Sequence, residues 1–280
     1  MRQFSVKDAC WNHRAAVATL KDRILFFAET VNDPISLSKF QYAQLLATTL
    51  EFRPDFILEL GRGAGNSTCV FTEAANQLGP GACKFLSIDL NDEWHQKTAP
   101  RLRERLPDTW FAPLVAEQHD ILDFDFRAAL AGTGRVLVFW DAHGFDVAEC
   151  VLGAVLPEIA VKPHIVLMHD MSDSRYGQPN NMDYGENGIW KGTDFSGPRL
   201  KMGFIDSAVA QSLSVLDFST RNRLPLHSAD HDLHGLDPEQ IAELQGLLGE
   251  LFCLNAHWCY FHLGEGRVPP TFPVFRRPAG

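Results

Sequence analysis

The sequence predicts an α/β fold: a doubly wound, mostly parallel sheet with helices on both faces. Two observations predict this fold. Short runs of branched and aromatic apolar residues alternate with longer segments that can form helices, and such runs are typical of strands buried in a parallel sheet. An acidic residue also stands at or near the end of each run, and the carboxyl ends of parallel strands share the sheet edge where ligands bind. The composition, 45% hydrophobic and 21% charged over 280 residues, is that of an ordinary globular chain.

The strands and helices of the core follow one another in a regular order. We expect strands at residues 56–60, 85–89, 136–141 and 165–170. We expect the helices between them at residues 66–78, 94–106 and 146–159. The acids that mark strand ends are Glu59, Asp89, Asp120, Asp141 and Asp170. A strand that alternates with a helix forms a βαβ unit, so the order favours a parallel sheet.

Three segments flank this core, which we place at residues 51–170. Residues 1–50 carry apolar positions typical of helices and are expected to pack on the sheet or to cover its ligand edge. Residues 171–236 are expected to be an insertion after the strand at 165–170, which is the fifth because Asp120 marks the end of a further strand. Its first part, up to Pro198, is a long loop rich in Gly, Asn, Asp, Ser and Pro. Such a loop at the ligand edge is expected to act as a substrate lid. Residues 237–280 return to regular structure.

The last segment carries a clear helix start. Asp237 suits the N-cap position and Pro238 the first helical position, so we expect a helix that runs to about Phe252. A closing pair of strands is expected at residues 257–263 and 271–276.

Charge and cysteine content narrow the class of partner. Lys and Arg number 25 against 35 Asp and Glu, a net charge of −10, which disfavours nucleic acids and anionic membrane surfaces. The sequence has neither an apolar stretch of about 18 residues nor the apolar start of a signal peptide, so membrane spanning and secretion are not expected. The six cysteines include no Cys-x-x-Cys pair and are interpreted as reduced thiols of a cytoplasmic protein. A small-molecule partner fits best, and a homo-oligomer is left open.

A glycine-rich turn between the first strand and the first core helix is the sharpest motif. Gly61, Gly63 and Gly65 alternate with other residues and let the backbone approach a ligand closely. A dinucleotide fingerprint would need a glycine at the position of Asn66, and a phosphate-binding Walker loop would need a lysine. NAD and nucleoside triphosphates are therefore disfavoured as ligands.

This turn, together with Asp89 at the end of the second strand, resembles the class I S-adenosylmethionine-dependent methyltransferases over residues 40–170. The resemblance implies a Rossmann-like sheet. It also implies that the glycines pass the methionine part of S-adenosylmethionine, with Glu59 as a polar anchor, and that Asp89 holds the ribose hydroxyls. Asp120 and Ile121 are implied to flank the adenine. A carboxylate suits a ribose because it can accept hydrogen bonds from two neighbouring hydroxyls.

Two later strand ends carry Asp141, His143, His169 and Asp170. They resemble the metal-dependent O-methyltransferases, especially the branch that acts on macrolide sugars and its cephalosporin-hydroxylase-like relatives. The resemblance implies that Asp141, His169 and Asp170 bind a divalent metal, magnesium or manganese, and that His143 is the general base, with Asp141 sharing the catalytic role. His169 replaces the first acid of the family's pair, and His143 follows Asp141 by two residues where the relatives show three. The alternative is that Asp141 caps the next helix and the histidines are ordinary polar residues of the strand edge.

These patterns predict an enzyme that moves a methyl group from S-adenosylmethionine to a hydroxyl of a small molecule, assisted by a divalent metal. The alternatives are a non-catalytic S-adenosylmethionine-binding module and a metal-free or hydroxylase-like relative on the same fold. A second polar cluster is more typical of a solvated loop than of a metal site. Its members are His227, Asp230, His231, Asp232 and His234.

Overall fold

The computed structural model describes residues 4–33, 37–169, 210–233, 235–249, 258–266 and 268–276. Its described strands form one seven-stranded sheet in the order β3-β2-β1-β4-β5-β7-β6. The strands are β1 (Phe56–Leu60), β2 (Lys84–Asp89), β3 (Leu114–Gln118), β4 (Val136–Trp140), β5 (His164–Met168), β6 (His227–Ser228) and β7 (Cys259–Phe261). β1 to β5 are parallel, whereas β7 runs antiparallel to β5 and to β6. The predicted doubly wound sheet is confirmed.

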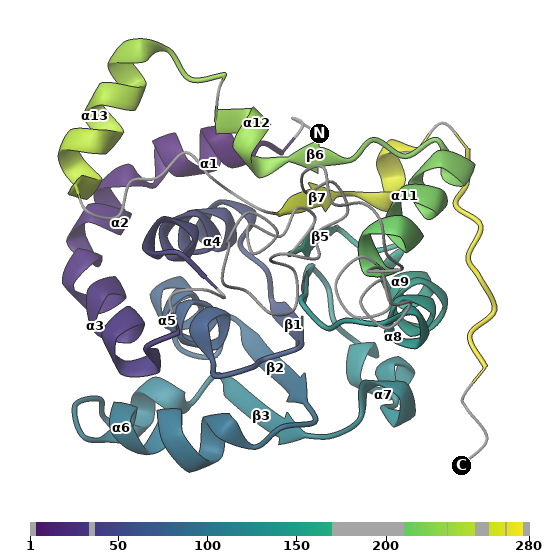
Figure 1. Ribbon diagram of the computed structural model, residues 1–280, viewed down its shortest axis with the longest axis horizontal. Helices are drawn as coiled ribbons and strands as arrows, with labels where there is room; N and C mark the ends of the chain where they lie inside the picture. Colours follow the sequence, from purple (N-terminus) through teal and green to yellow (C-terminus); the bar gives the residue numbers. More distant parts are fainter. Residues whose placement is uncertain are drawn as a thin grey trace, which may run out of the picture.

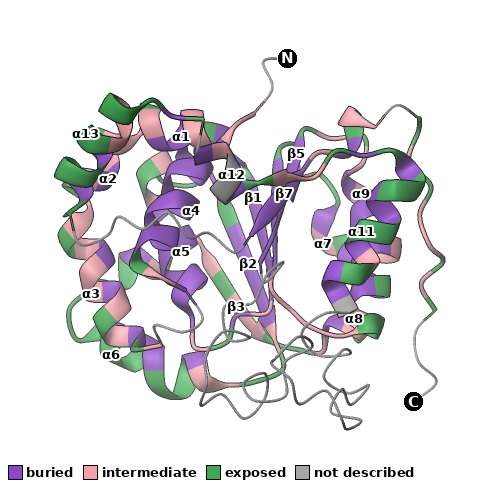
Figure 2. Ribbon diagram, turned by 45° about the horizontal axis from the view of Figure 1, so that its top comes forward, coloured by how far each residue is buried: buried purple, intermediate pink, exposed green. Residues whose placement is uncertain are grey.

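Helices cover both faces of the sheet (Figures 1 and 2). One face carries α1 (Val6–Asn12), α2 (Arg14–Thr19), α3 (Lys21–Val31), α4 (Lys39–Phe52), α5 (Asn66–Leu78), α6 (Ala99–Arg103), α12 (Ala229–Leu233) and α13 (Pro238–Leu248). The other carries α7 (Phe126–Leu130), α8 (Phe145–Cys150), α9 (Leu156–Ile159) and α11 (Ala210–Asn222). Each face has its own apolar cluster, since side chains alternate along a strand: Ile57 packs into the first and Leu58 into the second.

The place of β1 in the sheet explains the position of the ligand edge. β1 lies between β2 and β4, so the chain winds away from it in both directions. All five residues of β1, β4 and β5 are buried, as expected for apolar runs covered on both faces. The carboxyl ends of β1 and β4 therefore meet at a topological switch point, where ligands bind in open α/β sheets.

α4 is the most deeply buried helix of the first face. Its start is fixed by a capping box, in which Ser38 Oγ accepts the N–H of Gln41 and Gln41 Oε1 accepts the N–H of Ser38 at 2.7 Å. Twelve of its fourteen residues are buried, because α4 lies between the sheet and α1, α2 and α3 (Figure 2). Polar side chains at its start are thereby brought into the interior.

Several boundaries differ from the sequence expectations. Residues 271–276 run without strand pairing, so the expectation of a strand there is wrong; β7 pairs with β5 and β6 instead. α13 starts at the predicted cap, Asp237, but ends at Leu248. The helices expected at 94–106 and 146–159 each contain a π-helical segment, at Trp94–Thr98 and Val151–Val155. No described helix is long and apolar enough to cross a membrane.

Candidate functional site

Two glycines of the turn, Gly61 and Gly65, are closely packed, and the third, Gly63, faces open space. Gly61, Gly63 and Gly65 all have positive φ, at 89°, 52° and 103°, where side chains with a Cβ are strained. A Cβ on Gly61 would lie 2.7 Å from the backbone at Asp141 and Ala142, and one on Gly65 would collide with the Trp94 ring. A Cβ on Gly63 would meet nothing within 4 Å. Gly63 therefore borders the free space of the turn.

Asp89, at the end of β2, holds the turn by its backbone. Its Oδ2 accepts the N–H groups of Arg62 and Gly63 at 2.7 and 2.8 Å, and its Oδ1 accepts the N–H of Asn91 at 2.8 Å. Since an ionised carboxylate offers about four acceptor positions, the group keeps capacity beside the space bordered by Gly63. Leu90, the next residue, is 64% exposed and places an apolar side chain at the same edge.

Two buried ionisable side chains, Glu59 and Arg62, hold the residues around the glycine turn in place. The carboxylate of Glu59 is fully buried and accepts hydrogen bonds from the hydroxyls of Ser67 and Thr68, both at 2.6 Å, and of Ser87. Burial raises the pKa of Glu59 to about 7, although these hydroxyls and Arg62 favour its charged form. Glu59 thus anchors the start of α5 to β2.

Arg62 is a residue that the sequence analysis did not single out. Its guanidinium is buried and donates to Ser87 O at 2.9 Å and to Glu117 O at 3.2 Å, which ties the turn to the ends of β2 and β3. Burial lowers its pKa, opposed by Glu59 and Asp89. The only signal in the sequence is a charged residue between two glycines.

Asn66, which stands where a dinucleotide motif needs glycine, has a structural use. Its Nδ2 donates to Asp33 O at 3.0 Å, and its Oδ1 accepts from the Tyr42 hydroxyl. The side chain therefore ties the start of α5 to α4 and to the end of the N-terminal helices.

Asp120 and Ile121 lie just after β3. Asp120 Oδ1 accepts the N–H of Leu122 at 2.9 Å and caps the short 3₁₀ turn Ile121–Asp123. Ile121 is buried in the apolar cluster of the second face. Both stand at the carboxyl edge, and their contact with an adenine stays a prediction.

The loop after β4 brings three predicted residues together. Asp141 donates its N–H to Leu60 O at 2.8 Å, so the loop packs against the glycine turn. His169 Nδ1 lies 3.2 Å from Asp141 Oδ1, and His143 Nε2 lies 4.0 Å from the same oxygen. His169 is buried, whereas Asp141 and His143 keep 24% and 29% of their side chains exposed. A carboxylate between two imidazoles therefore adjoins the open turn.

The described residues do not form the metal site that was predicted at Asp141, His169 and Asp170. No group of three His, Cys, Asp or Glu side chains among the described residues is arranged to hold a metal ion, and Asp170 lies outside them. His169 Nε2 faces the side-chain nitrogen of Gln41 at 3.1 Å. Gln41 is a second residue missed from the sequence, where only its place in the Ser38-x-x-Gln41 capping box marks it.

The described side chains of the polar cluster at 227–234 lie in β6 and α12, not in a loop, and contact both the N-terminal segment and the C-terminal part of the chain. Asp232 accepts hydrogen bonds from Ser5 Oγ at 2.9 Å and from the Tyr260 hydroxyl at 2.7 Å. His227 lies 2.8 Å from Glu265 and stacks on Tyr260. The side chains of residues 230, 231 and 234 lie outside the described residues, as does the expected lid.

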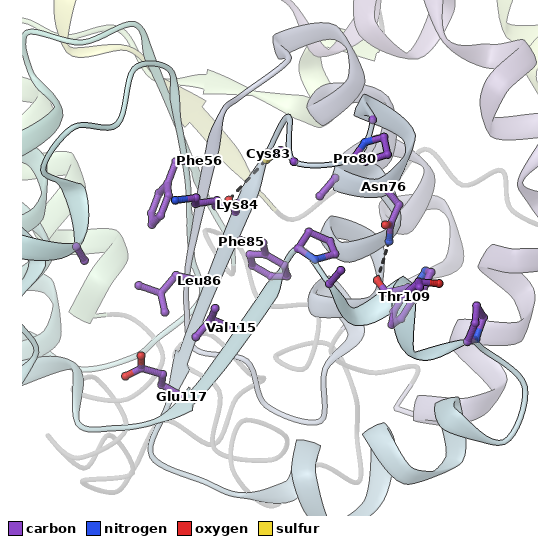
Figure 3. A pocket seen from close by; sticks show the side chains of 18 of the residues that line it. Phe56, Asn76, Pro80, Cys83, Lys84, Phe85, Leu86, Thr109, Val115 and Glu117 are labelled. Atoms are coloured by element: carbon purple, nitrogen blue, oxygen red, sulfur yellow. Dashed lines mark hydrogen bonds between the residues drawn. The ribbon is translucent and has the colours of Figure 1, made fainter.

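A cavity of about 1110 Å³ lies along the edge strand β3 (Figure 3). Phe56 and Lys84, at the amino ends of β1 and β2, line it together with Val115 of β3. None of the glycine turn, Asp89, Asp141 or the two histidines lines it. The cavity is therefore separate from the candidate site.

No protein-family model matches the chain, and no curated protein sequence matches it either. Solved structures do match. A candidate caffeoyl-CoA O-methyltransferase from Staphylococcus aureus aligns with a TM-score of 0.50 at 11% identity, over 86% of this chain and 90% of its own. The chain shares the Rossmann-like α/β fold of this structure. This likeness confirms the fold that the glycine motif and Asp89 predicted, and it concerns the fold alone.

Two further structures with a methyltransferase fold align at lower scores. The methyltransferase PaMTH1 of Podospora anserina, bound to SAH, has a TM-score of 0.49 at 10% identity, over 93% of this chain and 90% of its own. The O-methyltransferase TomG of Streptomyces achromogenes, in complex with SAM, has a TM-score of 0.48 at 17% identity, over 74% and 81%.

Proposed function

We propose that the chain is an S-adenosylmethionine-dependent O-methyltransferase that acts on a hydroxyl of a small molecule. One observation carries the proposal: the glycine turn, which borders open space at Gly63, packs directly against the loop that presents Asp141 and His143. A ligand on the turn and an acceptor beside His143 would thus lie next to each other. Holding two reactants together removes a large part of the entropic barrier to their reaction.

The residues of the turn fit the methionine and ribose parts of this cofactor. Gly63 leaves room for a close approach of the ligand to the backbone. Asp89 accepts three backbone N–H groups and keeps about one acceptor position, on Oδ1, for a ribose hydroxyl beside that room. Leu90 offers an exposed apolar surface at the same edge for the adenine. When bound, the cofactor supplies an electrophilic methyl group on a sulfonium.

His143 is proposed as the general base. Its Nε2 is buried on the side of Asp141 Oδ1, so Nδ1 is the nitrogen that accepts the proton of the acceptor hydroxyl. Asp141 then stabilises the imidazolium that forms, in the way an acid supports a histidine base in other enzymes. With its proton on His143, the hydroxyl oxygen would be the nucleophile toward the methyl group that the bound cofactor would supply; the S–CH₃ bond would break and the sulfur would leave as a neutral thioether.

A divalent cation, magnesium or manganese, is retained as a separate part of the proposal. Asp141 and Asp170 would supply oxygen ligands, which suit both ions. The described residues do not complete such a site, and the steps assigned to Asp89, Asp141 and His143 do not use it. Activity that falls with a chelator and returns with manganese would support the cation; activity that chelation leaves unchanged would remove it.

Calorimetry and a transfer assay test the function. We expect S-adenosylmethionine and its demethylated product to bind, and labelled methyl to appear on at least one member of a panel of catechols, sugars and other small hydroxylated molecules. Absence of binding at millimolar ligand, with NAD binding instead, would overturn the proposal. Cofactor binding with no transfer to any acceptor would favour the non-catalytic binding module.

A further inference from the structure

We infer that Thr98 is a positioning residue for the glycine turn. Together with Asp89 and Trp94 it makes residues 89–98 a clamp that sets the shape of the turn for its ligand. The inference rests on the proposed function and assigns a role within that same site. It follows from contacts that the clamp makes with consecutive residues of the turn.

The open part of the turn is held at both ends by side chains of the clamp. Asp89 Oδ2 accepts the N–H of Gly63 at 2.8 Å. The Thr98 hydroxyl donates to the carbonyl oxygen of Ala64 at 2.7 Å. The peptide unit between Gly63 and Ala64 is therefore fixed in direction from both ends. Because Gly63 borders the free space of the turn, this peptide unit lies where a ligand would approach.

Trp94 holds the next residue of the turn by packing. A Cβ on Gly65 would lie 2.3 Å from Cε3 of the Trp94 ring, and the backbone of Gly65 has a φ of 103°, which favours glycine. Trp94 and Thr98 are both buried, with 2% and 3% of their surface exposed. Gly63, Ala64 and Gly65 thus contact the clamp one after another.

A π-helical register brings Trp94 and Thr98 to the same side of their helix. The N–H of Ala99 donates to Trp94 O across the segment Trp94–Thr98, and Pro100 follows. A proline has no N–H and its ring crowds the carbonyl four residues earlier, which favours the wider register before it. Residues four apart lie on one side of a helix, so both side chains reach the turn. Single π-helical turns inside helices are frequent at functional sites.

The Thr98 hydroxyl should matter for binding as well as for folding. Without it the Ala64 carbonyl loses this donor, and the peptide unit between Gly63 and Ala64 is fixed from one end. The turn then spends less time in the shape that a ligand needs. The apparent dissociation constant rises in proportion as the binding-competent population falls, so we expect weaker binding of S-adenosylmethionine.

Three substitutions separate this role from packing. Thr98→Val keeps nearly the shape of the side chain and removes the donor, whereas Thr98→Ser keeps the donor and removes the methyl group. Thr49→Val is the matched control. Thr49 is buried in α4, and its hydroxyl also donates to a backbone carbonyl, Leu45 O, at 2.7 Å.

The first readout needs no ligand. In hydrogen-exchange mass spectrometry of the full-length chain, we expect fragments that cover residues 61–66 to exchange faster in Thr98→Val than in the wild type. Thr98→Ser and Thr49→Val should exchange there like the wild type. Unchanged exchange in Thr98→Val, or equally fast exchange in Thr49→Val, would overturn the inference.

The second readout is calorimetry with S-adenosylmethionine. Thr98→Val should raise Kd about three- to tenfold, whereas Thr98→Ser and Thr49→Val should stay within about twofold of the wild type. An unchanged Kd in Thr98→Val, or an equal rise in Thr49→Val, would overturn the inference. Absence of binding by the wild type would count against the proposed function, and the exchange measurement would then decide the inference.

Discussion

Glu59 makes the stability of the chain depend on pH in a way that one substitution should reveal. Its folded-state pKa is about 7, against 4.5 for the free side chain. The native state therefore binds more protons than the unfolded state between these values, so the free energy of unfolding falls as the pH rises through this window. Once the group is ionised in both states, the penalty reaches about 3 kcal/mol.

Gln in place of Glu59 removes this penalty. The hydroxyls of Ser67, Thr68 and Ser87 can rotate to serve an amide, so the site keeps its partners. Between pH 5 and pH 8 the stability of Glu59→Gln relative to the wild type should rise by about 2.5 kcal/mol. Urea unfolding at the two pH values measures this difference directly.

Ser87→Ala supplies the matched control. It removes a hydroxyl that favours the charged form of Glu59, so it should steepen the pH dependence that Glu59→Gln flattens. If Glu59→Gln and the wild type differ by the same free energy at both pH values, the carboxyl does not titrate in this window and the reasoning is refuted.

Four further outcomes are expected at the site and in the core. Gly61→Ala should lower Tm, because its Cβ would meet the backbone 2.7 Å away. Gly63→Ala should keep Tm within a few degrees of the wild type and weaken S-adenosylmethionine binding, because a Cβ there enters open space. Equal effects of the two variants on Tm would contradict this. Asp89→Asn should weaken cofactor binding by about 1–3 kcal/mol in calorimetry through lost charge-assisted bonds, and a neutral result would remove it from the site. Burial lowers the pKa of His164 below 6.5, so stability should be lost as the pH falls below that value, and His164→Asn should lose part of this acid sensitivity in thermal melts at pH 5 and 7.5. His143→Ala should slow single-turnover transfer about 10²–10⁴-fold with cofactor affinity unchanged, and an equal loss of affinity would make it structural.

The parallel part of the sheet could be predicted because its signal is local. β1, β4 and β5 are apolar runs whose residues are all buried. Only one strand of the antiparallel pair could be predicted. β7 lies within the strand expected at 257–263, whereas its partner β6 has two residues, His227–Ser228, which no apolar run marks. Their pairing depends on contacts between segments far apart in the chain, whereas residues 271–276 carry an apolar pattern and form no strand.

The same distinction between local sequence signals and contacts across distant segments applies to the candidate site. The glycine turn and Asp89 lie in short motifs at the ends of neighbouring strands, and the structure brings them into contact. The hydrogen-bond partners of Glu59 could not be predicted from the sequence, because its three hydroxyl partners come from two different elements, α5 and β2. Arg62 was missed for a similar reason: it donates to the backbone carbonyls of Ser87 and Glu117 and to the Ser87 hydroxyl, all on strands far from it in the sequence.

His169 shows why residue type at a predicted strand end does not fix a role. An imidazole beside two acids is consistent with a metal ligand, a base or a hydrogen-bond donor, and the choice depends on what faces each nitrogen. Here His169 Nε2 faces Gln41, 128 positions away, whose local function is to start α4. Glutamine and glutamate serve a helix cap almost equally, yet only glutamine can donate to His169. A substitution that is conservative for the helix would therefore remove the donor that faces His169 Nε2, and this coupling appears only when both elements are seen in one structure.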